Sequence, residues 1–223
     1  MSLNSEPISQ RQALILKPKT SFLFLLMVLL MYLVSGVFLQ PSLGMMGVFI
    51  NQIGFILFPC ILICYHQDYF LDDWPLWKKP DALSVWITLG LTLLFSVLID
   101  QAISFQEKKW PLPKNIQLFF DEITHIQNVY DGILKTLVLC LTPAFCEEIL
   151  FRGLLQTSWV ARFGKKVGIL ITALAFAIAH GNPWYLHLYF ILGIFLGILL
   201  EWRRSLWLPI LAHFLNNVLT LFS

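Results

Sequence analysis

Three short stretches of this chain carry polar or ionisable side chains inside otherwise apolar runs. The first holds two adjacent carboxylates, Glu147 and Glu148, and then Arg152. An ionised side chain near the centre of a membrane helix costs about 2.5–3.5 kcal/mol on insertion scales, so such residues are functional candidates by default. The carboxylate pair therefore indicates a site where buried charge does chemistry.

The spacing of the first stretch gives its two carboxylates different roles. Glu148 and Arg152 are four residues apart, so on a helix they share a face and can pair. Glu147 is rotated by about 100° and cannot share that partner well. We expect Arg152 to neutralise Glu148 and leave Glu147 poorly solvated and suited to proton transfer. The alternative is a structural salt bridge with a spare acid near the cytoplasmic interface.

The other two stretches each contribute a histidine. Phe176-x-x-x-His180 ends a short apolar run, and His213-x-x-x-Asn217 lies in the last one. The i, i+4 spacing puts the imidazole of His213 and the carboxamide of Asn217 on one helix face. Such a polar stripe faces the bundle interior or a wet cavity. Taken alone, His180 is more typical of a packed or interfacial histidine.

Together these side chains fit water-mediated hydrolysis. Glu147 can deprotonate water, one imidazole can share the proton, and the other imidazole with Asn217 can donate to a developing oxyanion. Glu147, His180 and His213 could instead hold a divalent metal such as zinc, with one open coordination position. The H-E-x-x-H zinc motif is absent. We therefore favour a mechanism that needs no metal or other cofactor.

The composition supplies the elements that must position these residues. The chain has 223 residues, of which 58% are hydrophobic and only 13% charged, and its mean hydropathy is +0.75. Soluble domains carry about 25% charged residues. The fold class predicted is an all-α, polytopic membrane bundle of about seven helices, since a span needs about 20 apolar residues. The expected helices cover residues 21–39, 47–65, 83–104, 132–156, 167–180 (short), 186–200 and 206–222.

The positive charges predict the orientation of the bundle. If the N-terminus lies in the cytoplasm of a cell with an inner membrane, most Lys and Arg residues fall on the cytoplasmic side, as the positive-inside rule expects. That side would hold 11 of the 15: Arg11, Lys17, Lys19, Lys78, Lys79, Arg152, Arg162, Lys165, Lys166, Arg203 and Arg204. The net charge of +2 suits anionic lipid headgroups and does not indicate nucleic-acid binding.

We expect one integral membrane domain with two regions. Residues 1–131 supply N-terminal membrane helices and an outer amphipathic segment within residues 105–130. That segment is predicted to be a surface helix that caps the bundle, with a substrate gate as the alternative. Residues 132–223 form the region that carries all three motifs. Counting about 1.5 Å per residue puts Glu147 and His213 roughly 10–14 Å from the cytoplasmic face and His180 roughly 20 Å from it.

The three motifs in this order resemble those of the CPBP family, which includes CaaX-processing endopeptidases and bacteriocin-processing or immunity (Abi) proteins. They are Glu-Glu-Ile-Leu-Phe-Arg-Gly at 147–153, Phe-x-x-x-His at 176–180, and Ser-Leu-Trp-Leu-Pro-Ile-Leu-Ala-His-x-x-x-Asn at 205–217. The resemblance covers about residues 142–217. Residues 132–223 would then be the catalytic core of the family.

This resemblance implies an intramembrane endopeptidase that cleaves membrane-associated or lipidated proteins or peptides of the CaaX type. By position, Glu147 would be the general base and His180 would assist it. His213 and Asn217 would stabilise the oxyanion, and Glu148 with Arg152 would give structural or electrostatic support. Members of the family are commonly labelled metalloproteases. The alternative is a non-catalytic immunity or scaffold protein that uses the same cavity.

Overall fold

The computed structural model describes residues 15–67 and 74–223 of the chain. Helices and connecting turns make up these residues, and no strand occurs among them. The predicted all-α class is therefore confirmed. Arg11, one of the charges used to predict the orientation, and the beginning of the predicted N-terminal region lie outside the described residues.

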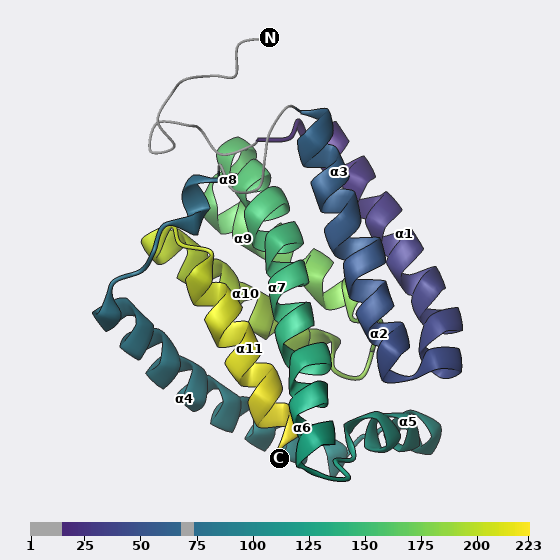
Figure 1. Cartoon of the computed structure of the whole chain (residues 1–223). Helices are drawn as coiled ribbons and strands as arrows, with labels where there is room; N and C mark the ends of the chain where they lie inside the picture. Colours follow the sequence, from purple (N-terminus) through teal and green to yellow (C-terminus); the bar gives the residue numbers. More distant parts are fainter. Residues whose placement is uncertain (1–14, 68–73) are drawn as a thin grey trace.

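The described helices follow the predicted apolar runs closely (Figure 1). Two of them are long and continuous but carry π-helical turns: residues 45–66 contain α2, η2 and α3, and residues 129–163 contain α6, η5, α7, η6 and α8. In chain order the elements are α1 (Pro18–Leu43), α2 (Met45–Asn51), η2 (Gln52–Leu57), α3 (Phe58–His66), η4 (Pro75–Trp77), α4 (Ala82–Glu107), α5 (Lys114–Thr124), α6 (Val129–Lys135), η5 (Thr136–Leu141), α7 (Thr142–Glu148), η6 (Ile149–Gln156), α8 (Thr157–Phe163), α9 (Lys165–Ala179), α10 (Leu186–Arg203) and α11 (Trp207–Leu221).

Apolar surface on the outer helices identifies a bundle built for lipid. In the described part of the chain, four helices are long and apolar enough to cross a membrane: α1, the helix Met45–His66, α4 and α10. On α1, the side chains of Leu23, Leu26 and Leu30 are more than half exposed. Such a surface is stable in hydrocarbon and not in water. The chain is a polytopic membrane protein, while the number of crossings, about seven, stays a prediction.

Proline residues account for two of the π-helical turns. The segment η2 ends just before Phe58-Pro59, and η5 ends just before Thr142-Pro143. A proline within a helix has no N–H to donate, and its ring collides with the carbonyl oxygen four residues earlier. A widened turn moves that carbonyl away and lets the helix continue. The third π-helical segment, η6, begins immediately after Glu148 and has no proline to explain it.

The helix that carries the carboxylates lies inside the bundle. Figure 1 shows α7 between α11 on one side and α2 on the other. Every residue from Ile149 to Gln156 is buried. The glycines of α10 allow a close approach of neighbouring helices, because a Cβ added at Gly193 would lie 2.8 Å from the Cα of Ala173. The site is thus enclosed by protein rather than by lipid.

The predicted amphipathic segment forms α5, which takes no part in the core. None of its residues is buried, and Figure 1 shows it at the end of the bundle where α6 begins. Its position agrees with a surface helix. A role as a cap or as a gate remains a prediction.

Candidate active site

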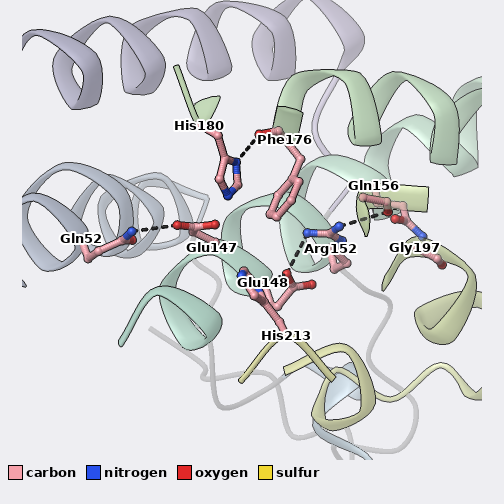
Figure 2. Close-up of polar contacts among 10 residues, drawn as sticks. Gln52, Glu147, Glu148, Arg152, Gln156, Phe176, His180, Gly197 and His213 are labelled. Atoms are coloured by element: carbon pink, nitrogen blue, oxygen red, sulfur yellow. Dashed lines mark hydrogen bonds and ion pairs between the residues drawn. The ribbon is translucent and has the colours of Figure 1, made fainter. Parts of the chain in front are cut away.

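The two carboxylates lie at the junction of α7 and η6, and both are buried. Glu148 is 0% exposed and Glu147 is 6% exposed. They point in different directions, toward different partners, as Figure 2 shows. The asymmetry predicted from their helical phase is therefore present in the structure.

Glu148 is the centre of a buried cluster of charge. Arg152 Nη1 donates to Glu148 Oε1 at 2.7 Å, and His213 Nδ1 lies 2.9 Å from the same oxygen. Arg152 Nη2 also donates to the carbonyl oxygen of Gly193 at 3.1 Å. Arg152 is completely buried, so it is not a charge of a cytoplasmic loop. It should not be counted among the Lys and Arg residues from which the orientation was predicted. Its pairing with Glu148 was predicted correctly.

Glu147 has a neutral partner that comes from another helix. Gln52, the first residue of η2, donates from Nε2 to Glu147 Oε1 at 2.7 Å. The second oxygen, Glu147 Oε2, is buried and has no hydrogen-bond partner among the described residues. A buried carboxylate oxygen without a donor is costly in a protein interior. One oxygen of Glu147 is therefore fixed and the other is available to a substrate or to water.

His180 faces the free side of Glu147. Its Nδ1 lies 2.8 Å from the carbonyl oxygen of Phe176, and since a carbonyl only accepts, Nδ1 carries the proton. The neutral ring then presents an unprotonated Nε2. Figure 2 shows this ring turned toward Glu147, with which His180 interacts electrostatically. Stacking on Tyr189, with ring centroids 4.0 Å apart, holds the imidazole plane.

His213 is oriented by the same argument. Its Nδ1 contacts a carboxylate oxygen of Glu148, so Nδ1 is the donor and Nε2 is free. In the neutral ring Nε2 can only accept, so His213 donates to a second group through Nε2 only as an imidazolium. The adjacent Glu148 carboxylate is placed to stabilise that cation, much as an acidic residue orients and supports a catalytic histidine.

Phe176 joins the two histidines and the arginine. Its ring centroid lies 4.5 Å from that of His180 and 5.6 Å from that of His213, and the Arg152 guanidinium carbon lies 4.5 Å from the ring centroid. Through Phe176 the two histidines belong to one cluster, and the difference in depth expected for His180 stays a prediction.

The structure adds two contacts that the sequence did not predict. One is the bond between His213 Nδ1 and Glu148, and the other is the bond from Gln52 to Glu147. The contacts above do not include Asn217, which lies partly buried one turn after His213. Sequence reasoning missed Gln52 as a member of the site. Its one signal was an amide in an apolar run.

The alternative metal site of Glu147, His180 and His213 finds no support in the described residues. Within residues 15–67 and 74–223, no three His, Cys, Asp or Glu side chains are placed to hold one ion. The partners of the ligand candidates differ, because His213 bonds through Nδ1 to Glu148 while Gln52 donates to Glu147 Oε1. The residues present therefore do not form the metal site considered as the alternative.

Fold and site together define a class of protein, a helical membrane bundle with a buried Glu, Arg and His cluster. Residues 130–219 match the model of a family described as Rce1-like, type II CAAX prenyl endopeptidase. The resemblance of the motifs to the CPBP family is therefore confirmed for this part of the chain. At the level of the family, the match supports an intramembrane endopeptidase.

A curated relative supports the same family. The uncharacterized protein YpbD of Bacillus subtilis (strain 168) is 29% identical over 150 residues, which make up 65% of this chain and 70% of the relative. No solved structure matches the chain. The non-catalytic immunity or scaffold protein predicted as the alternative is not favoured by these matches.

Proposed function

We propose that the chain hydrolyses peptide bonds of membrane-associated or lipidated, CaaX-type proteins or peptides, with Glu147 as the general base. The observation that carries this proposal is the state of the Glu147 carboxylate. One oxygen accepts a hydrogen bond from Gln52, and the other is buried and unpaired among the described residues. Glu148 also has a buried, unpaired Oε2, but its Oε1 is bound by the cation Arg152 and by His213, whereas the only hydrogen-bond partner of Glu147 among the described residues is the neutral Gln52.

The proposed reaction begins with a water at Glu147 Oε2. Glu147 takes a proton from the water as the water oxygen attacks the carbonyl carbon of the scissile bond. The electrons of the C=O double bond move to the carbonyl oxygen, which becomes an oxyanion. His213, as an imidazolium beside Glu148, and the Asn217 amide donate to this oxyanion. Glu147, assisted by His180 Nε2, then delivers the proton to the amide nitrogen as the C–N bond breaks. The second proton of the water stays on the new carboxyl group and passes to the amine on release, so the products are a carboxylate and a protonated amine.

Burial gives the charged groups their effect. Glu147, Glu148 and Arg152 carry a formal charge of −1 together, and an imidazolium at His213 brings the sum to zero. Donors held in a water-poor site stabilise developing charge more strongly than they do in water, and they need not reorganise during the reaction. The cluster around Glu148 therefore stabilises the oxyanion, and Glu147 deprotonates the attacking water.

The experiment is peptide cleavage by the purified protein in lipid. Fluorogenic peptides with a C-terminal CaaX sequence, either prenylated or unmodified, are cleaved by wild type and not by His180→Ala or His213→Ala, if the protein is an endopeptidase of this kind. A prenylated peptide cleaved no faster than the unmodified one would remove lipidated proteins as the substrate class. Both variants cleaving like wild type would contradict the catalytic assignment.

A further inference from the structure

The N-terminal helices reach into the site through Gln52. This side chain is only 2% exposed and lies 95 residues from Glu147 in sequence. It belongs to the region predicted to supply membrane helices only. Figure 2 shows its amide reaching Glu147 from a helix on the side away from Arg152.

The orientation of the Gln52 amide is fixed by its two partners. An ionised carboxylate only accepts, so the amide presents its NH₂ group to Glu147 Oε1. The same Nε2 lies 3.4 Å from the hydroxyl of Tyr32 on α1. Both amide hydrogens therefore have an acceptor, and turning the amide over would place its carbonyl oxygen against Glu147 Oε1.

The backbone under Gln52 is held as well. The π-helical segment η2 begins at this residue, and π-helical turns occur frequently at functional sites. Asn51, one residue earlier, donates to the backbone oxygen of Tyr32 at 3.1 Å and accepts from the Ser35 hydroxyl. Tyr32 thus anchors both amides, one through its backbone and one through its hydroxyl.

We propose that Gln52 is a positioning residue for the general base. Its hydrogen bond holds Glu147 Oε1 so that Oε2, the buried oxygen without a partner, is the one that faces water and substrate. This inference rests on the proposed function of Glu147. It makes the N-terminal helices part of the active site and not only a membrane support.

The pH profile of cleavage depends on the titratable groups around Glu147. The titratable side chains that interact electrostatically with Glu147 come from α1, α7, η6, α9 and α10, and they are Tyr32, Cys146, Arg152, His180 and Tyr189. A hydrogen bond to the ionised form of a carboxylate favours that form. Loss of the Gln52 amide therefore removes a stabilising donor from the Glu147 carboxylate, and the pH profiles of the variants are compared against this unchanged set of neighbours.

The test uses full-length protein in lipid and the substitutions Gln52→Met and Gln52→Glu. Met keeps the length of the side chain without a donor, so we expect kcat to fall about 10- to 100-fold, as for the loss of a hydrogen bond to a charged group. KM should change little, and the acid limb of kcat/KM should move to higher pH. Gln52→Glu can donate only when protonated, so its activity relative to Gln52→Met should recover as pH falls.

The control is Thr92→Val, which removes a buried hydroxyl that donates to the backbone oxygen of Thr88 on α4. It should leave kcat and the pH profile of cleavage unchanged. If Gln52→Met keeps the wild-type kcat and pH profile, the positioning role is wrong while the proposed function stands. If wild type and Glu147→Gln cleave equally, the proposed function itself has failed. Tyr32→Phe removes only the hydroxyl that accepts from Gln52 Nε2, so it should shift the acid limb of kcat/KM in the same direction but by less. A wild-type pH profile for both Tyr32→Phe and Gln52→Met would overturn the proposal.

Discussion

Replacing Arg152 by Met should destabilise the protein far more than a surface arginine would. The side chain is completely buried, as is its partner Glu148, and their ion pair measures 2.7 Å. Removing one member of a buried pair leaves an uncompensated charge and costs about 3–5 kcal/mol. At about 2–4 °C per kcal/mol for a protein of this size, the expected fall in Tm is about 6–20 °C.

The assay is thermal unfolding followed by tryptophan fluorescence, with Arg204→Met as the matched control. Arg204 makes an ion pair of nearly the same length, 2.8 Å to Glu201, but its side chain is 45% exposed. Exposed pairs are worth about 0–1 kcal/mol, so the control should shift Tm by no more than about 4 °C. Equal shifts for Arg152→Met and Arg204→Met would refute the argument from burial.

A double variant separates lost packing from unpaired charge. Glu148→Gln in the Arg152→Met background removes the orphaned carboxylate and keeps an oxygen for His213. Replacing both members of a buried pair is often close to neutral. Much of the lost Tm should therefore return. A double variant less stable than Arg152→Met would mean that packing, and not charge, dominates.

Three further predictions concern the fold and the site. Gly153→Ala would place a Cβ 2.1 Å from a ring carbon of Trp74, whereas Gly54→Ala meets nothing within 4 Å; thermal unfolding should show a loss of about 1–3 kcal/mol for the first and none for the second. The Asp81 pKa is lowered by hydrogen bonds from the Ser84 side chain and backbone. Asp81→Ala should therefore lower Tm at neutral pH, and the difference in Tm from wild type should vanish as pH falls through that lowered pKa. A difference in Tm that persists in acid would contradict the capping role. Peptide cleavage should continue in the presence of EDTA or phenanthroline, and a loss of activity reversed by zinc would contradict the metal-independent site.

Local features of the fold were predictable because apolar runs and helical phase are local properties. The pairing of Glu148 with Arg152 followed from their spacing alone. The helix predicted to end at residue 156 continues to Phe163, because Thr157 and Ser158 are polar but buried, and their hydroxyls donate to backbone carbonyls of the preceding turn. A polar residue therefore did not mark the end of this helix.

Contacts between distant helices were not predictable in the same way. The bonds from Gln52 to Glu147 and from His213 to Glu148 join residues 95 and 65 positions apart. They depend on how the helices cross and on the π-helical turns that change the phase of each helix. Periodicity in one sequence contains neither quantity. The residue types of the site could therefore be predicted, but which histidine serves which carboxylate could not.

The most direct test of the account compares Glu147→Gln with wild type in kcat for cleavage of a membrane-tethered peptide. Gln keeps the shape of the side chain and cannot accept the proton, so kcat should fall by about 10²- to 10⁴-fold, while KM and Tm stay close to wild type. Cleavage at the wild-type rate by Glu147→Gln would contradict the assignment of Glu147 as the general base.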